Sequence, residues 1–224
     1  RLEYAPTWLV FASVVLVCYA VFIQSILKTK RILEQNQHLE QEQQLYKLVY
    51  VDALTGLYNR AAYTEKINEI ERQRDGETLC CVMVDCNRFK QINDAYGHHM
   101  GDKALQRVAA ALRTVFQRET DYLFRIGGDE FAVLLQGCPA EKVGERLDLL
   151  ERELAEGSAQ LQIELTVSSG CAVAAPGETI ENAFIRADSH MYQHKKAFYS
   201  ETGDRTAGGG LDASNPALDG PPRA

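Results

Sequence analysis

The sequence predicts an α+β domain with a mixed, mostly antiparallel central sheet flanked by helices, preceded by a long helical segment. Three features predict this fold. No charged residue occurs from Tyr4 to Leu27, helical patterns alternate with short apolar runs over residues 51–200, and two of those runs flank Gly127-Gly128 as in a β-hairpin. Strands joined by a tight turn are antiparallel, which excludes a doubly wound parallel sheet.

The charge-free N-terminal segment has the length of a transmembrane helix. As a helix it would be roughly 36 Å long, and a bilayer's hydrocarbon core is roughly 30 Å thick. Three basic residues follow between positions 28 and 31, so the positive-inside rule places the remainder in the cytoplasm. We expect a transmembrane helix over residues 1–27; the alternatives are a buried core helix and a signal peptide, which would carry its charge before the apolar run. Because the chain begins with Arg rather than Met, we also expect further sequence upstream.

Two further segments lie outside the compact domain. Residues 28–50 contain neither Gly nor Pro, so we expect a helical linker. Ile32, Leu39 and Tyr46 recur every seven residues and allow a short parallel coiled coil, but the other seam positions are polar, which favours a marginal signalling helix. Residues 201–224 hold almost no large apolar side chain and are predicted to be a disordered tail. The compact domain is therefore expected over residues 51–200, which is about the length of one ordinary domain.

The elements of this domain follow from their apolar patterns. We predict helices over residues 60–74, 103–117, 140–155 and 180–199; in the second, Leu105, Val108 and Leu112 share one face. Residues 78–85, TLCCVMVD, form a short apolar run rich in strand formers and are predicted as a buried central strand. Further strands are expected over residues 122–126, 131–135 and 162–174.

Charge and cysteine content exclude some functions. The chain has 31 acidic and 24 basic residues and a formal charge of -7, which argues against a general nucleic-acid binder. None of its six cysteines forms a CxxC pair, so a structural metal site or a disulfide framework is not expected. Reduced thiols that fill apolar space are the default interpretation.

Acidic residues stand at the ends of two predicted strands. Asp85 ends the first buried strand, and Asp129-Glu130 follows the Gly-Gly turn. If the strands are neighbours, these carboxylates come together, and such oxygens suit Mg²⁺ or Mn²⁺ with phosphate oxygens in the remaining positions. The pattern therefore indicates a nucleotide site; the alternative is a solvated hairpin tip.

Two turns add to this pattern. Gly127 and Gly128 would let a base or a phosphate approach the backbone closely, which alone is weak support. Phe89 and Lys90 lie in the turn after the Asp85 strand and before a helix. Backbone N–H groups exposed there could cradle phosphate beside the charge of Lys90.

Four blocks of this sequence resemble one known family. Residues 127–131 read GGDEF, the signature of bacterial diguanylate cyclases, and residues 52–60 read DALTGLYNR, similar to that family's opening DxLTGLxNR. Residues 85–102, which contain DCNRFKQIND, YGH and GD, and residues 187–195, ADSHMYQHK, resemble its remaining blocks. The blocks occur in the expected order over residues 51–198, which makes the resemblance specific.

The resemblance implies a fold, a reaction and partners. The fold would be similar to nucleotidyl cyclase and polymerase palm domains. The reaction would join two GTP molecules into cyclic di-GMP and release two pyrophosphates, with Mg²⁺ (or Mn²⁺), in a homodimer whose subunits each bind one GTP. With the apolar helix, this implies a membrane enzyme of the bacterial inner membrane whose catalytic domain is cytoplasmic, with no nucleic acid as partner.

The resemblance also implies roles for the acidic residues. Asp85, Asp129 and the carbonyl of Cys86 would ligate Mg²⁺, which leaves the Cys86 side chain without a role. Asp129 would be the leading candidate to help deprotonate the ribose 3′-hydroxyl, with Glu130 beside it. Which of these two acts as the base stays open, because metal ions lower the demand on any base.

Further positions match the family's substrate contacts, namely Phe89, Lys90 and Lys195 for phosphate and Asn93 and Asp102 for guanine. A carboxylate such as Asp102 can accept from both N1–H and N2–H₂ of guanine, which adenine does not offer. The alternatives are a solvated surface position for Lys90 and Lys195, and an N-cap of the helix at Lys103 for Asp102.

A last pair matches the family's product-binding inhibitory site, RxxD. Arg118 and Asp121 lie shortly before the signature, and Arg can grip guanine or phosphate while Asp accepts from guanine N1–H. The alternative is a salt bridge at a helix end.

For the whole chain, the second hypothesis is a catalytically silent receptor that binds cyclic di-GMP at this site, which the intact acidic residues disfavour.

Three positions depart from the family's pattern. Residues 197–200 read AFYS where Gly-Arg-Asn is frequent, Tyr58 replaces a common Pro, and Asn87 stands where Asp is often found. None of these removes an expected metal ligand or guanine contact.

Overall fold

The computed structural model describes residues 7–74, 78–175 and 177–203. The chain separates into two units, Arg1–Val49 and Tyr50–Ala224, and each is described by itself. The predicted tail of residues 201–224 lies outside the described residues from position 204 onward.

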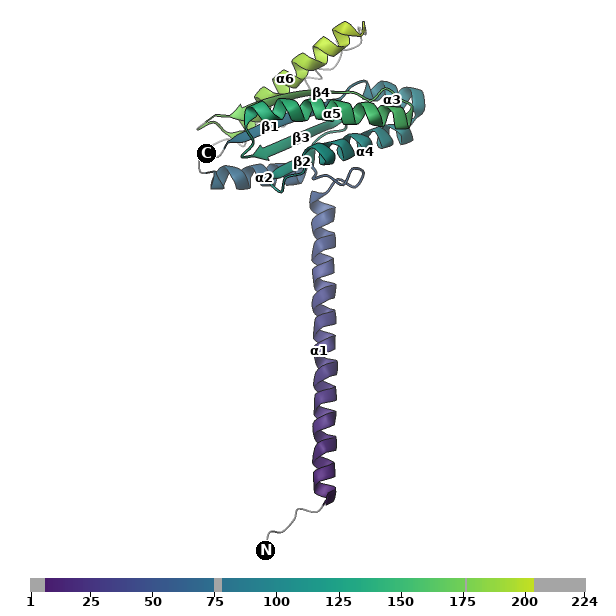
Figure 1. The fold of residues 1–224 in the computed structure, drawn as a ribbon, viewed down its shortest axis with the longest axis vertical. Coiled ribbons are helices and arrows are strands. Elements are labelled where there is room, and N and C mark those ends of the chain that lie inside the picture. Colours follow the sequence, from purple (N-terminus) through teal and green to yellow (C-terminus); the bar gives the residue numbers. More distant parts are fainter. Residues whose placement is uncertain (1–6, 75–77, 176, 204–224) are drawn as a thin grey trace, which may run out of the picture. The chain divides into compact units, whose positions relative to one another are not determined.

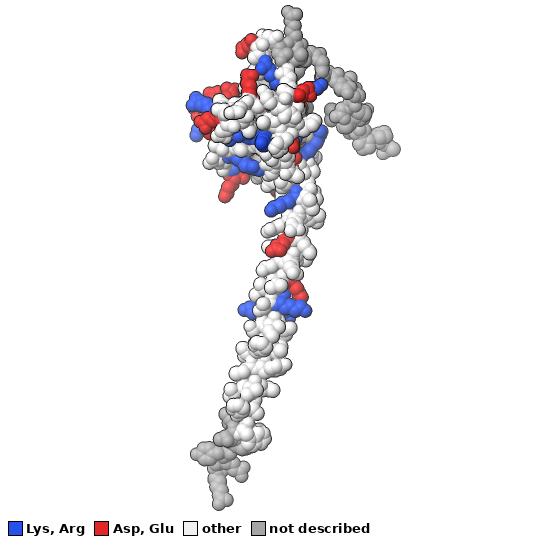
Figure 2. Space-filling model, turned by 90° about the vertical axis from the view of Figure 1, so that its right-hand side faces the viewer, with Lys and Arg blue, Asp and Glu red and all other residues white. Residues whose placement is uncertain are grey.

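The first unit is one helix, α1 (Thr7–Tyr50), which continues without a break through the predicted membrane segment and linker (Figure 1). Its stretch Phe11–Tyr50 contains a window long and apolar enough to cross a membrane, judged by length and composition. On the face shown in Figure 2, the N-terminal part of the helix carries no charged side chain. Charged residues begin in its second half, as the sequence predicts.

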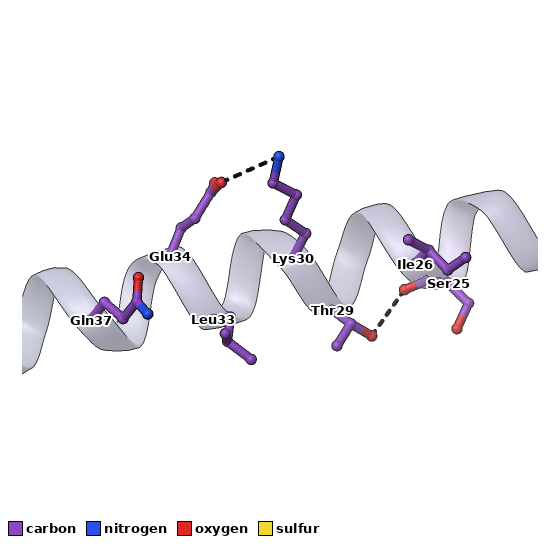
Figure 3. A pocket seen from close by; sticks show the side chains of 7 residues that line it. All are labelled: Ser25, Ile26, Thr29, Lys30, Leu33, Glu34 and Gln37. Carbon is purple, nitrogen blue, oxygen red and sulfur yellow. Dashed lines mark hydrogen bonds and ion pairs between the residues drawn. The ribbon is translucent and has the colours of Figure 1, made fainter.

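The polar half of α1 is stabilised by contacts within the helix. Figure 3 shows the hydroxyl of Thr29 donating to the Ser25 carbonyl at 3.0 Å and Lys30 paired with Glu34 at 3.8 Å. These residues line a shallow furrow on a single exposed helix, which has no second wall to enclose a ligand. The heptad positions Ile32, Leu39 and Tyr46 are exposed in the single chain.

The second unit contains a four-stranded sheet in the order β2-β3-β1-β4. Its strands are β1 (Leu79–Cys86), β2 (Asp121–Arg125), β3 (Glu130–Gln136) and β4 (Val167–Ala174). All three strand pairs are antiparallel, so the predicted mixture of directions is wrong for the strands themselves. In the described part of the chain, the one parallel pairing is an isolated bridge between Tyr58 and Phe124.

Helices cover both faces of the sheet (Figure 1). The alternation of β1 divides the core: Cys80, Val82 and Val84 pack with α4 and α5, whereas Leu79, Cys81 and Met83 pack with α2 and α6. The helices of this unit are α2 (Arg60–Gln73), α3 (Phe89–Tyr96), α4 (His98–Val115), α5 (Ala140–Leu161) and α6 (Ile180–Glu201). A strand buried on both faces explains the continuous apolar run of β1.

Most predicted elements are confirmed, and three boundaries are wrong for local reasons. Helix α4 begins at His98 rather than Lys103, directly after Gly97, whose φ of 82° separates it from α3. Helix α5 continues to Leu161, where Gln162 caps it in the left-handed conformation. Strand β4 therefore starts at Val167 rather than 162, because the intervening residues turn back so that the Ser158 hydroxyl bonds both backbone groups of Leu165.

The outer edge of β4 is covered by side chains from one face of α6. The guanidinium of Arg186 donates to the Val173 carbonyl at 2.6 Å, and Nδ1 of His190 lies 2.7 Å from the Cys171 carbonyl. His194 continues the series, with Nδ1 accepting from the N–H of Ser169 at 3.1 Å. The three side chains are four residues apart, so they follow the strand edge as the helix advances.

Gly170 explains how closely this helix approaches the strand. A Cβ at this position would lie 2.1 Å from the backbone nitrogen of Met191 and 2.3 Å from the carbonyl oxygen of Ala187. Only glycine permits that contact between a strand and a helix backbone. This backbone contact and the three side-chain contacts fix the position of α6 along β4.

Candidate active site at the signature turn

The carboxylates predicted to act together do lie at one end of the sheet. Asp85 is paired with Glu130 in the β1–β3 register, and the N–H of Cys86 donates to the Asp129 carbonyl at 3.1 Å. Asp85 is buried, Asp129 is half-buried and Glu130 is exposed. The antiparallel pairing of β1 with β3 thus joins two acidic segments that are far apart in sequence.

Burial makes the charge of Asp85 unfavourable. Desolvation, together with the charges of Asp129 and Glu130, raises the pKa of Asp85 to about 6, although Lys195 opposes the shift. Desolvation and the charges of Asp129 and Asp188 also raise the pKa of Glu130. The end of the sheet therefore holds more negative charge than its protein surroundings neutralise.

Lys195 of α6 is the cation at this site. Its Nζ lies 2.6 Å from Oδ1 of Asp85. Burial would lower the pKa of Lys195, but the hydrogen bond and the charge of Asp85 outweigh burial and raise it. The two side chains form an ion pair, so the solvated surface position considered for Lys195 is not what the structure contains.

The donor set at this end of the sheet fits a hard divalent cation. Asp85, Asp129 and the backbone carbonyl of Cys86 supply oxygen atoms, and the excess carboxylate charge favours a cation. Within the described residues, no group of three His, Cys, Asp or Glu side chains is arranged to hold a metal ion, so side chains alone would not complete a site. Burial raises the pKa of the Cys86 thiol to about 12, which keeps it a neutral filler.

The turn that links β1 to α3 is held in an unusual conformation. Arg88 has a φ of 55°, a left-handed conformation that non-glycine residues seldom adopt. The side chain of Asn87 is buried and is bound by the hydroxyls of Ser168 at 2.7 Å and Thr166 at 3.3 Å. Phe89 and Lys90 follow as the first residues of α3, where backbone N–H groups have no acceptor within the helix.

One of the two residues predicted to contact guanine has a buried polar atom without a hydrogen-bond partner among the described residues. Oδ1 of Asn93 is buried and has no hydrogen-bond partner among the described residues. A Cβ at Gly101 would lie 2.0 Å from that oxygen, so any larger residue would have to displace the Asn93 amide. Asp102 is exposed and lies inside α4, which begins at His98, so its interpretation as an N-cap is wrong.

Arg125 joins the opening block to the signature turn. Its guanidinium donates to Asp52 at 3.0 Å and to the carbonyl of Gly128 at 2.8 Å. Asp52 also accepts from the N–H and the hydroxyl of Thr55. Burial would raise the pKa of Asp52, but the hydrogen bonds from Thr55 and Arg125 outweigh it and lower the pKa.

The RxxD pair does not form the helix-end salt bridge considered as its alternative. The Asp121 side chain is fully buried and pairs with Arg146 of α5 at 3.0 Å, while the backbone N–H of Arg118 donates to it at 3.2 Å. The guanidinium of Arg118 is exposed and makes no ion pair in the described part of the chain. Sequence reasoning missed Arg146, because nothing in the spacing links it to Asp121.

Comparisons with known proteins agree with this fold. The family model described as diguanylate cyclase, GGDEF domain, matches residues 49–200. Diguanylate cyclase DgcP of Pseudomonas aeruginosa is 34% identical over 185 residues, which are 78% of this chain and 27% of that protein. Diguanylate cyclase DgcS of Shewanella oneidensis is 34% identical over 157 residues, 69% of this chain and 52% of that protein.

A solved structure shares the architecture as well. The coiled coil and GGDEF domain of DgcB from Caulobacter crescentus, in complex with c-di-GMP, superposes with a TM-score of 0.64 at 28% identity and covers 80% of this chain and 95% of that one. The match defines an antiparallel α+β domain of the GGDEF type. The chain belongs to the GGDEF-domain diguanylate cyclase family. It spans about a quarter of the length of DgcP and about half that of DgcS.

Proposed function

We propose that this chain is a diguanylate cyclase, anchored in the bacterial inner membrane by α1, that condenses two GTP into cyclic di-GMP and two pyrophosphates. The observation that carries the proposal is the buried Asp85, whose pKa is raised, with Asp129 beside it on the next strand and the start of α3 at Phe89 and Lys90 close by in the chain. A buried carboxylate of raised pKa near the N–H groups at the start of a helix suits a cation and a triphosphate together. Membership in the family and the similarity to named cyclases support the same activity.

Asp85, Asp129 and the Cys86 carbonyl would hold Mg²⁺ (or Mn²⁺). When bound, the ion supplies polarisation of the triphosphate and of the attacking oxygen. Lys90 and the amides of residues 89 and 90 bind phosphate oxygens, and Lys195 adds positive charge from α6. Asp129 is the leading candidate to take the proton of the ribose 3′-hydroxyl, with Glu130 beside it as the alternative, and Gly127 and Gly128 leave room for the nucleotide against the turn.

Asn93 and Asp102 would select guanine. The unpartnered oxygen of Asn93 is an acceptor already desolvated for a base, and the carboxylate of Asp102 accepts two donors from the guanine edge. Adenine has no such pair of donors, so ATP cannot form both hydrogen bonds with Asp102. This difference supports GTP as the substrate.

The active species would be a homodimer, because each domain has one such site and the reaction needs two GTP molecules. The exposed heptad positions of residues 28–50 supply a parallel contact between two copies of the linker. We propose the boundaries accordingly: a membrane helix over 1–27, a linker over 28–50, the catalytic domain over 51–200 and a tail over 201–224.

Product inhibition would act through Arg118 and Asp121. The exposed guanidinium of Arg118 can form paired hydrogen bonds with guanine or phosphate of cyclic di-GMP. The Asp121 side chain is fully buried, pairs with Arg146 and accepts from the backbone N–H of Arg118, so in this conformation Arg118 is the member of the pair that can contact the product. Replacement of Arg118 by Ala should shift the inhibition curve to higher product concentration, and an unchanged curve would refute this assignment.

Product analysis tests the proposal directly. The purified chain, in detergent or without α1, is mixed with Mg²⁺ and GTP, ATP or both at a concentration that forms dimers. Cyclic di-GMP from GTP alone supports the proposed reaction. Binding of cyclic di-GMP without any turnover would instead identify a silent receptor, and a mixed dinucleotide would refute the assignment of Asn93 and Asp102.

A further inference from the structure

The end of α6 contacts the turn at residues 87–90 through residues that depart from the family's pattern. The backbone N–H of Arg88 donates to the hydroxyl of Tyr199 at 3.1 Å. The guanidinium of Arg88 lies 5.2 Å from the ring centre of Phe198 and 3.2 Å from the carboxylate of Glu164. Residues 197–200 are the same four that lack the family's frequent Gly-Arg-Asn.

The hydrogen bond from Tyr199 acts on a strained point of the backbone. Arg88 is one of two non-glycine residues with positive φ in the described part of the chain. Such a conformation persists where the surroundings hold it. The hydroxyl of Tyr199 accepts from the N–H of this residue, and the neighbouring Asn87 side chain is held by Ser168 of β4 and by Thr166 just before that strand.

The position of Tyr199 is itself well determined. Helix α6 is bound to the edge of β4 by Arg186, His190 and His194, and it touches the backbone of that strand at Gly170. The ring of Tyr199 also packs edge-on against Phe198 with centroids 5.4 Å apart. One rigid helix therefore carries Lys195 to Asp85 and, one turn later, Tyr199 to the Arg88 turn.

We infer that Tyr199 is a positioning residue for the triphosphate of GTP, acting through the backbone of Arg88 on the amides of Phe89 and Lys90. The inference rests on the proposed function, since those amides are taken as phosphate ligands. Tyr199 does not need to touch the nucleotide. It sets the direction of the N–H groups that do, so its loss weakens ground-state binding of the triphosphate more than it slows the chemical step.

The test compares Tyr199→Phe with Tyr192→Phe in the full chain. Both substitutions remove one hydroxyl from α6, but the Tyr192 hydroxyl has no hydrogen-bond partner among the described residues, and its ring contact with Lys196 survives in Phe. We expect Tyr199→Phe to raise the KM for GTP about three- to tenfold, the effect of one lost hydrogen bond, with kcat within about twofold. Tyr192→Phe should leave both unchanged.

Binding measurements separate this inference from the proposed function. The probes are 3′-deoxy-GTP with Mg²⁺, which cannot react, and guanosine, which has no phosphate. Tyr199→Phe should weaken the binding of 3′-deoxy-GTP by the same factor by which it raises the KM for GTP. The affinity for guanosine should not change. If wild type binds 3′-deoxy-GTP but makes no cyclic di-GMP from GTP, the proposed function fails while the affinity ratio still tests the inference.

Three results would overturn the inference. Equal affinities of Tyr199→Phe and Tyr192→Phe for 3′-deoxy-GTP would show that the hydroxyl does not matter. An equal loss for guanosine would show a general effect on folding rather than on phosphate. No binding of 3′-deoxy-GTP to the wild-type chain would overturn both the inference and the proposed function.

Discussion

Two aspartates adjoin the signature turn, and their pKa values move in opposite directions. Asp52 is bound by Thr55 and by Arg125, which also holds the Gly128 carbonyl, and its pKa is lowered. Asp85 is more deeply buried and has one cation against several carboxylates, and its pKa is raised. A satisfied carboxylate supports the shape of the turn, whereas an under-neutralised one indicates where a ligand supplies the missing charge.

The largest expected effect comes from removing the two aspartates of the proposed metal site. Asp85→Ala and Asp129→Ala should each lower the rate of cyclic di-GMP formation by about 10²-fold or more, because the proposed site would lose an oxygen ligand. Thermal unfolding should show that both variants remain folded. Asp148→Ala, at an exposed position on α5, is the matched control and should keep the wild-type rate. Substantial turnover by Asp129→Ala would contradict its role.

Lys195, the cation paired with Asp85, comes next. Lys195→Met should reduce kcat/KM for GTP about 10- to 10²-fold, since the positive charge proposed to act on phosphate is lost. Lys196→Met removes the neighbouring charge, which lies over the exposed ring of Tyr192, and should have little effect. Steady-state kinetics on both variants makes the comparison; equal losses would mean that only the net charge of α6 matters.

Removing the partner of Asp52 should lower the stability of the fold more than it lowers the rate of the reaction. Arg125→Met leaves Asp52 half-buried without its charged partner and frees the Gly128 carbonyl, at an expected cost of about 2 kcal/mol in the free energy of unfolding. Denaturant titration measures this cost. Arg72→Met, near the end of α2, is a control for the loss of a surface charge. A stable Arg125→Met variant would show that the turn is held by its backbone alone.

The smallest expected effect is a dependence on pH. The folded-state pKa of Asp52 is below its ordinary value, so its stabilising contribution is present above about pH 4 and is lost as the pH falls through the folded pKa. The difference in melting temperature between wild type and Asp52→Asn should therefore be constant near neutrality and shrink below pH 4. A gap that does not shrink at all as the pH falls below 4 would assign the stabilisation to packing.

Local sequence was sufficient to predict most helices and strands and to predict that Asp85 and Asp129 lie at the ends of neighbouring strands. The apolar run ending at Asp85 and the Gly-Gly turn before Asp129 predict two strands with carboxylates at their ends, because burial and turn geometry act over a few residues. The boundary of α4 was missed because Gly97, a single residue, decides where that helix starts. The contiguous motifs likewise identify the family without any knowledge of the fold.

What only the tertiary structure decided are contacts between residues far apart in the chain. Arg146 with Asp121, Arg125 with Asp52, and Tyr199 with Arg88 join positions 25, 73 and 111 residues apart, and no periodicity or spacing predicts them. The raised pKa of Asp85 is likewise a property that only the tertiary structure decides, because it depends on how completely the sheet and α6 exclude water from one carboxylate. Sequence alone determined the family and the order of its motifs, and with them which side chains are expected to carry the chemistry. Packing decided which charges lack a full set of partners, since desolvation is a property of the assembled fold.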